Sequence, residues 1–405
     1  MPEAGQGSEV MLFPEPIPST GVCRYPMVVI IPDDCSTGGR VERDGRGPLE
    51  RCRWGAEDFH IPHRWGVGMI RVGLIGYGHW GPKLARCFSQ ALDFSLAAIC
   101  DVSADRLGLA GSAHAGVRLV NDWRELVADP GIDAIAVATP AAIHAPIALA
   151  ALGEGKHVLV EKPLGRSVQE AEALVREARS RGRVLMVDHT FIFSPAVRAI
   201  RKLLDEAELG EPRYFDSVRI GAGIVREDVN VLWDLAVHDL SILHHVLPAA
   251  PCAVQANGLA LNGMGREQIA YLTLRYAAPF IAHMHVNWRA PEKTRRMLIG
   301  GTRRVLVYDD LDAEATVRVH DGAVPGMNGH AVGAHPAGPW SPPLERVEPL
   351  AAVVRHFGDC IARGGVPLSD AGAALRVVRL LEAADRSLAA GGNAIAVNGD
   401  GAMIA

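Results

Sequence analysis

Between residues 70 and 190, apolar runs of strand length alternate with stretches whose apolar positions recur at the period of a helix. The apolar runs predict strands at 70–76, 95–101, 133–139, 157–163 and 184–190. The stretches between them predict helices at 83–92, 123–129, 148–155 and 167–181. Because strands that alternate with helices build a parallel sheet covered by helices, we predict one doubly wound (Rossmann) α/β domain over residues 69–190.

The pattern changes after Pro195, where strand-like runs follow one another with few helices between them. The predicted strands lie at 213–220, 253–261, 270–277, 280–288 and 303–311, and the predicted helices at 198–209, 234–247, 350–364 and 370–391. Closely spaced strands joined by short turns predict a large mixed or antiparallel sheet. We therefore expect a substrate-binding α+β domain over residues 191–368, and a helix and strand at 369–405 that pack back on the two domains.

Two stretches follow neither period and are rich in glycine and proline. Residues 1–68 are expected to be a disordered extension. Met69 directly precedes the first strand, so we expect the native protein to start there, and peptides from before Met69 in natively expressed protein would refute this. Residues 322–343 are expected to form a long loop that is either mobile or a lid over a binding site.

Composition narrows the class of protein. A length of 405 residues and a net charge of −5, without a block of Lys or Arg, favour a two-domain enzyme over a nucleic-acid-binding protein. The seven cysteines are scattered without a C-x-x-C pair, which is typical of reduced cytosolic thiols. The longest apolar stretch, 132–152, is interrupted by prolines, and the N-terminus has no basic segment before an apolar run. We therefore expect a cytoplasmic protein without a membrane partner, a nucleic-acid partner or a bound metal.

A glycine-rich turn, Gly76-Tyr77-Gly78-His79-Trp80-Gly81, follows the first predicted strand and opens the first helix. In a chain with 43 glycines this spacing alone carries little information. Asp101, however, ends the next strand, where a ribose-binding acid is expected. This context predicts a dinucleotide site. Gly76 permits the tight turn, Gly78 lets the backbone approach the pyrophosphate, and Gly81 lets the helix pack closely with its first amides toward the phosphates.

The same acid predicts which dinucleotide is bound. Asp101 is expected to accept hydrogen bonds from the ribose hydroxyls. Its carboxylate repels a 2′-phosphate, and no arginine immediately follows it in the sequence. We therefore predict NAD rather than NADP as the cofactor.

Hydride transfer from a secondary alcohol requires a group that takes the hydroxyl proton, close to the carboxyl ends of the strands. Two such ends carry Thr139-Pro140 and Glu161-Lys162-Pro163. The Lys162 ammonium can hydrogen-bond a substrate oxygen and favour its deprotonation. The alternative is a solvated lysine at a strand end.

Asp234 and His238 stand four positions apart and share one face of the predicted helix. His238 titrates near neutrality and can accept a proton, while Asp234 can orient His238 or hold a substrate hydroxyl. The alternatives are an Asp234 that caps the helix and a His238 with a structural role.

The motifs GYGHWG, ATPAAIH, EKP and D-x-x-x-H occur in this order between Met69 and Val397, and together they resemble the Gfo/Idh/MocA oxidoreductases. The resemblance implies that Lys162 and His238 are catalytic, with Asp234 assisting. It also implies a set of cofactor-binding residues: Gly76, Tyr77, Gly78, His79, Trp80, Gly81, Asp101, Thr139, Pro140, His144, Glu161 and Lys162.

Within that family, stretches such as 77–86, 188–198 and 228–243 look most like bacterial nucleotide-sugar 3-dehydrogenases, including UDP-N-acetylglucosamine types. The resemblance implies oxidation at carbon 3 of a UDP-sugar. The substrate-binding residues that it implies are Arg219, Asn230, Trp288 and Arg295.

Two departures from the family pattern leave the exact sugar open, with UDP-glucose as one alternative. Asp188 stands where relatives commonly carry glycine, and the loop after His320 is richer in glycine and proline than in relatives. An inositol or free-sugar dehydrogenase of the same family, or a non-catalytic NAD-binding sensor, are further alternatives. A homodimer or homotetramer is expected.

Overall fold

The computed structural model describes residues 68–223, 226, 228–261, 263, 265–322 and 338–397. The predicted extension at 1–68, apart from Gly68, and most of the predicted loop at 322–343 lie outside these ranges. Within them, no helix combines the length and the apolar character that crossing a membrane requires.

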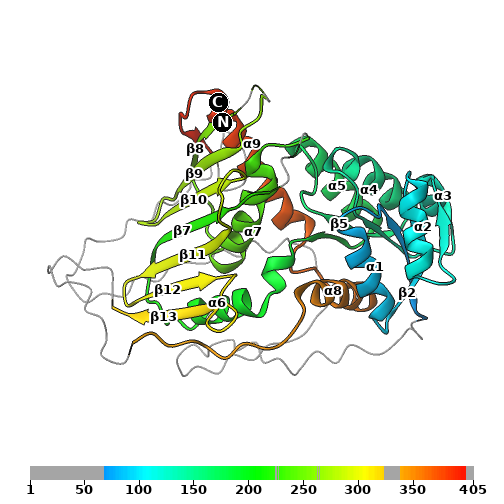
Figure 1. Ribbon diagram of the computed structural model, residues 1–405, viewed down its shortest axis with the longest axis horizontal. Coiled ribbons are helices and arrows are strands. Elements are labelled where there is room, and N and C mark those ends of the chain that lie inside the picture. The colour runs from blue at the N-terminus through cyan, green and yellow to red at the C-terminus, as the bar shows by residue number, and fades with distance from the viewer. Residues whose placement is uncertain are drawn as a thin grey trace, which may run out of the picture. The chain divides into compact units, whose positions relative to one another are not determined.

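Six parallel strands form the first sheet, sheet A, in the order β3-β2-β1-β4-β5-β6. They are β1 (Ile70–Ile75), β2 (Phe94–Cys100), β3 (Arg118–Val120), β4 (Ala134–Val137), β5 (His157–Glu161) and β6 (Leu185–Asp188). All four residues of β4 are buried, because helices cover both faces of the sheet (Figure 1). This order confirms the predicted doubly wound fold, in which ligands bind where the strand order reverses, here between β1 and β4.

The helices of this half are α1 (Gly81–Gln90), α2 (Ala104–Ala113), α3 (Trp123–Ala128), α4 (His144–Gly153) and α5 (Val168–Arg181), with a short 3-10 turn η1 (Ala141–Ile143). α5 begins where the sequence predicts, because the Ser167 hydroxyl accepts a hydrogen bond from the Glu170 amide. α2 was not predicted. Only Ala110 of this helix is buried, so its sequence shows no apolar stripe of helical period.

One further helix of this half comes from the far end of the chain. α8 (Pro349–Arg363) packs against α1, and its Phe357 ring stacks on Phe94 of β2 with ring centres 6.1 Å apart. The sequence analysis had placed this helix in the second domain. It lies on sheet A because its apolar face completes the core around Phe88 and Phe94.

Eight strands form sheet B in the order β13-β12-β11-β7-β10-β9-β8-β14. They are β7 (Pro212–Ile220), β8 (Ala253–Leu259), β9 (Ile269–Arg275), β10 (Ile281–Asn287), β11 (Thr294–Gly301), β12 (Arg304–Asp309), β13 (Val317–Asp321) and β14 (Ile395–Ala396). β7 and β10 run parallel, and the other neighbours run antiparallel, which confirms a mixed sheet. β11 was not predicted because its first residues, Thr294-Arg295-Arg296, interrupt the apolar alternation.

The remaining elements lie between and beside the two sheets (Figure 1). They are η2 (Thr190–Phe193), α6 (Pro195–Asp205), the π-helical turn η3 (Leu232–Ala236), α7 (Val237–Val246) and α9 (Ala371–Ala389). α9 contacts α5 of the first half and β8 of sheet B. η3 packs against β10, which brings the D-x-x-x-H motif to the carboxyl ends of the strands of sheet A.

Candidate active site

The turn after β1 leaves no room for a side chain at its first and last glycines. Gly76 has a φ of +97°, and a Cβ added there would lie 2.6 Å from the Ala138 carbonyl oxygen. A Cβ on Gly81 would collide with the Gly76 carbonyl. Gly78 has open space around it, and the nearest atom to its added Cβ is Arg106 Nη1 at 3.9 Å. The turn is therefore closed at its ends and open in the middle, as the close approach of a pyrophosphate requires.

Asp101 is fixed beneath this turn by two backbone amides. Its Oδ2 accepts a hydrogen bond from the Tyr77 amide at 2.7 Å, and its Oδ1 accepts one from the Ser103 amide at 2.9 Å. Arg106 Nη1 lies 3.6 Å from Asp101 Oδ2 and was missed by the sequence analysis. Ser103 caps α2, so Arg106 stands in the first turn of that helix and reaches back to the acid. In the sequence, the helix-capping Ser103 followed three residues later by Arg106 was the pattern that could have predicted an arginine close to Asp101.

We expect Asp101→Ser to lower kcat/KM with NAD by about tenfold or more, because hydrogen bonds to a charged carboxylate contribute about 1.5–3 kcal/mol. The same change should raise kcat/KM with NADP, since Arg106 is released to meet a 2′-phosphate. Initial rates with both cofactors measure the two effects. Adding Arg106→Ala should abolish the gain with NADP, and a gain that persists in the double variant contradicts this role for Arg106.

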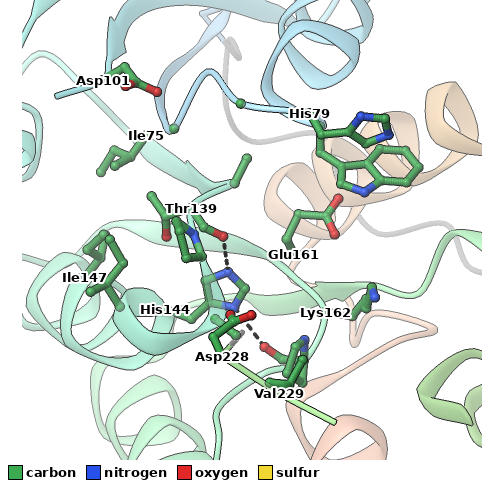
Figure 2. A pocket seen from close by; sticks show the side chains of 18 of the residues that line it. Ile75, His79, Asp101, Thr139, His144, Ile147, Glu161, Lys162, Asp228 and Val229 are labelled. Atoms are coloured by element: carbon green, nitrogen blue, oxygen red, sulfur yellow. Dashed lines mark hydrogen bonds between the residues drawn. The ribbon is translucent and has the colours of Figure 1, made fainter. Parts of the chain in front are cut away.

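A cavity of about 420 Å³ extends from the glycine turn past the ends of β4 and β5 to η3. Figure 2 shows Asp101 and Lys162 on opposite sides of it, with Thr139 and Glu161 between them. All of the predicted cofactor-binding residues except Tyr77 and Gly81 line this cavity. The lining fits a dinucleotide, because it offers a carboxylate for a ribose, an open turn for the phosphates and a path toward Lys162 for the nicotinamide.

His144 joins the two strand ends that form the floor of the cavity. Its Nδ1 lies 2.9 Å from the Pro163 carbonyl oxygen and its Nε2 lies 2.8 Å from the Thr139 carbonyl oxygen (Figure 2). Burial lowers the pKa of His144, so its ring is neutral and donates one of these two hydrogen bonds. Both nitrogens face the backbone, and His144 contributes shape to the cavity instead of a polar contact to a cofactor.

Lys162 is held at the end of the cavity by the π-helical turn. Its Nζ donates hydrogen bonds to the Asp234 carbonyl oxygen at 2.9 Å and to Asp234 Oδ1 at 3.1 Å. A π-helical turn shifts the helical hydrogen-bonding register, and such turns are frequent at functional sites. The Lys162 side chain is 8% exposed, so the ammonium is desolvated and directed by Asp234 alone among the described residues.

Two further side chains fix the carboxylate of Asp234. Trp288 Nε1 donates to Asp234 Oδ2 at 3.0 Å, and Arg226 Nε lies 3.5 Å from Asp234 Oδ1. Burial acts to raise the pKa of Asp234, but Lys162 and Arg226 outweigh it and hold the pKa below its ordinary value. Asp234 is therefore a carboxylate that positions Lys162. The sequence analysis had instead expected it to orient His238 or to hold a substrate hydroxyl.

His238 begins the first turn of α7 and lies outside the lining of the cavity. Its ring meets the edge of Phe191, with ring centres 5.1 Å apart, and its Nδ1 is enclosed without a hydrogen-bond partner in the described part of the chain. Burial lowers the pKa of His238 well below 6.5, and the charge of Lys162 adds to this. The imidazole is therefore neutral and has a free lone pair for a proton, but this low pKa contradicts the prediction that His238 titrates near neutrality. The predicted pairing with Asp234 does not form among the described residues, because the Asp234 carboxylate contacts Lys162, Trp288 and Arg226 instead.

Arg219, a predicted substrate-binding residue, is buried in an ion pair. Its Nη2 lies 2.7 Å from Asp239 Oδ1 and its Nε donates to the same oxygen at 3.0 Å. The two side chains are 4% and 1% exposed, and the guanidinium stacks on Phe191 at 4.5 Å from the ring centre. These contacts give Arg219 a structural role in joining β7 to α7, and its role in substrate binding stays a prediction.

The other three predicted substrate-binding residues also lie outside the cavity lining. Asn230 caps η3, since its Oδ1 accepts hydrogen bonds from the Leu232 and Trp233 amides. Trp288 holds Asp234 as described above. Both therefore act on the position of Asp234, and their direct contact with substrate stays a prediction. Arg295 pairs with Asp310 at 3.0 Å and remains partly exposed, so its substrate role stays a prediction.

Arg226 and Asp228 line the cavity and were missed by the sequence analysis. Both precede η3 in a short polar stretch that leads into the D-x-x-x-H motif. A charged residue two positions from another polar residue, directly before a catalytic motif, was the available signal. It was missed because the stretch has neither strand nor helix period.

Two family models match the sequence. Residues 70–189 match an oxidoreductase family with an NAD-binding Rossmann fold, and residues 197–307 match the Gfo/Idh/MocA C-terminal domain. The two matches cover sheet A and most of sheet B.

Curated and solved relatives agree with these models. A UDP-N-acetylglucosamine 3-dehydrogenase of Acidithiobacillus ferrooxidans is 30% identical over 254 residues, which are 61% of this chain and 76% of that enzyme. A solved structure of the Acidithiobacillus ferrooxidans UDP-N-acetylglucosamine 3-dehydrogenase superposes with a TM-score of 0.69 at 26% identity, over 80% of this chain and 98% of that one. A scyllo-inositol 2-dehydrogenase of Bacillus subtilis is 30% identical over 149 residues, which are 36% of this chain and 44% of that enzyme.

The family models thus agree with the order of the strands in the two sheets and with the sequence motifs around the cavity. The open glycine turn and Asp101 fit the cofactor that the first family model names. The chain belongs to the Gfo/Idh/MocA family of oxidoreductases, and its first domain is the NAD-binding Rossmann domain of that family.

Proposed function

We propose that the protein uses NAD to oxidise a ring secondary hydroxyl of a sugar, at carbon 3 of a UDP-sugar. The observation that carries this proposal is the Lys162 ammonium, which Asp234 fixes at the end of the dinucleotide cavity remote from Asp101. An ammonium group that is shielded from water and held in one orientation here stabilises the negative charge that develops when a hydroxyl becomes an alkoxide. The Acidithiobacillus relative, named for action at carbon 3 of UDP-N-acetylglucosamine, supports the choice of sugar and position.

The reaction breaks the O–H bond and the neighbouring C–H bond of the alcohol, and its C–O single bond becomes a double bond. NAD, when bound, accepts the hydride. Two of the three Lys162 N–H groups have partners on Asp234, and the third is directed to the substrate oxygen in this proposal. The alcohol proton passes to His238, which is neutral because burial lowers its pKa well below 6.5.

The test is a substrate panel with the full chain and NAD. We expect growth of NADH absorbance with UDP-N-acetylglucosamine, UDP-N-acetylglucosaminuronate or UDP-glucose, and a product carbonyl at carbon 3 by NMR. The matched controls are the same sugars without the nucleotide. Equal rates with and without UDP contradict recognition of the nucleotide, and a carbonyl at another carbon contradicts the position.

One alternative has a specific observation in its favour, because the Bacillus relative is named as a scyllo-inositol 2-dehydrogenase. Activity with inositols but with none of the UDP-sugars would select it. A non-catalytic NAD sensor would bind NAD without turning over any sugar. The ion pair between Lys162 and Asp234 argues against the sensor, since binding NAD alone does not require an ammonium group held in one orientation. The homo-oligomer expected from the sequence remains a prediction.

A further inference from the structure

Glu161 and Asp188 end two neighbouring strands of sheet A. They are register partners across β5 and β6. Because directly paired residues of parallel strands project from the same face of the sheet, their carboxyl groups are neighbours. Asp188 thus adds a second carboxyl group beside the glutamate that lines the cavity.

The surroundings of this carboxyl pair do not support two negative charges. Glu161 is 6% exposed and Asp188 is 1% exposed. The Thr190 hydroxyl donates a hydrogen bond to Asp188 Oδ1 at 2.7 Å, but Glu161 Oε1 and Asp188 Oδ2 have no partner among the described residues. Two unpaired carboxylates side by side in a buried site are too costly, and such a pair retains a proton.

The charged and titratable groups around the pair are few. Lys162 follows Glu161 in the chain, and its charge acts to lower the pKa of both carboxyls, but burial outweighs it and the ammonium is bound by Asp234. The other neighbours are the Cys87 thiol of α1 and His189, whose pKa burial lowers to about 3, so that it carries no charge. Burial raises the pKa of Glu161 well above its ordinary value, and Asp188 adds to the effect. Burial likewise raises the pKa of Asp188.

Glu161 brings the pair to the part of the cavity that extends from the glycine turn toward Lys162, where the nicotinamide would lie in the proposed cofactor site. Asp101 and the glycine turn mark the ribose and phosphate side, and Glu161 lies between them and Lys162 (Figure 2). The oxidised nicotinamide ring carries a positive charge and the reduced ring carries none. A cation placed beside a protonated carboxyl pair favours the ionised form of that pair.

We propose that Glu161 and Asp188 share a proton in the cofactor-free protein and release it when NAD+ binds, but not when NADH binds. The inference rests on the cofactor site described above. It makes Asp188 a residue that tunes the balance between oxidised and reduced cofactor. By linkage, the affinity for NAD+ rises with pH while the affinity for NADH changes little.

The experiment measures proton release on binding to the full chain without substrate. Calorimetric titrations in two buffers of different ionisation enthalpy give the number of protons released per cofactor bound. We expect NAD+ to release a measurable fraction of a proton, up to about one, and NADH to release close to none.

Two isosteric variants locate the source of the proton. In Asp188→Asn and in Glu161→Gln, the new side-chain amide can donate a hydrogen bond to the carboxylate that remains. The remaining carboxylate is therefore ionised before the cofactor binds. Binding of NAD+ should then release no proton. Glu177→Gln removes a partly exposed carboxyl of α5 that pairs with Arg181 on the same helix, and this variant should behave as the unaltered protein does. Proton release that persists in both site variants overturns the inference.

The outcomes also separate this inference from the cofactor assignment. NAD+ binding without proton release at any pH in the neutral range overturns the carboxyl pair as a proton donor and leaves the dehydrogenase proposal standing. Failure of the unaltered protein to bind NAD+ or NADH overturns the cofactor assignment and this inference together.

Discussion

Replacing Lys162 with methionine should lower kcat by about a thousandfold or more while NAD still binds. The Lys162 side chain is 8% exposed, and methionine retains most of its apolar length without the charge. Asp234 loses its main partner, but Trp288 and Arg226 still contact its carboxylate. Steady-state rates on the substrate found in the panel, and NADH fluorescence for binding, measure the two parts of this prediction.

The matched control for this variant is Lys202→Met on α6. Lys202 is 74% exposed and lies 3.9 Å from Glu206 in the next helical turn, so its loss should leave kcat unchanged. Near-normal turnover in Lys162→Met would remove the basis of the proposed mechanism. A loss of NAD binding in that variant would show that Lys162 serves the cofactor more than the hydroxyl.

A second large effect is expected at a residue that the sequence analysis assigned to the substrate. Arg219→Met should lower the free energy of unfolding by about 3–5 kcal/mol, because it leaves Asp239 buried without a countercharge. Among the residues that the structure describes, Ser217 alone then contacts that carboxylate, through a hydrogen bond of 3.3 Å. Urea unfolding followed by circular dichroism measures the shift.

The double variant Arg219→Met/Asp239→Leu separates the charge from the packing. Removing both charges should recover much of the lost stability, because no uncompensated charge remains in the core. If Arg219→Met instead keeps full stability and raises only KM for the sugar, Arg219 binds substrate as the sequence resemblance implied.

The parts of the fold that carry a strong period could be predicted from the sequence. Sheet A was predicted except for β3, because its other strands are continuous apolar runs. β11 escaped because polar residues open it, and α2 because its single buried side chain leaves no stripe. The position of α8 could not be predicted, since periodicity identifies an apolar face but not the surface that covers it.

The candidate site, like the fold, could be predicted from the sequence only in part. The glycine turn is a local feature, so its geometry followed from residues close in the chain. The partners of Lys162 did not, because they depend on a π-helical turn 72 residues away in the sequence. The spacing of Asp234 and His238 predicted that they share one helix face, but the Asp234 carboxylate is bound by Lys162 from a different element, a long-range contact that helix spacing cannot predict.

The packing of α8 on α1 also sets a condition on how the chain is made. Residues of sheet A leave the ribosome well before residues 349–363, so the apolar surface around Phe88 and Phe94 waits for Phe357 before it is covered. An emerging chain with such a surface is prone to aggregation until residues 349–363 have emerged. The cofactor domain is therefore complete in sequence by residue 190 apart from α8, but it is complete as a folded unit only once residues 349–363 have been made.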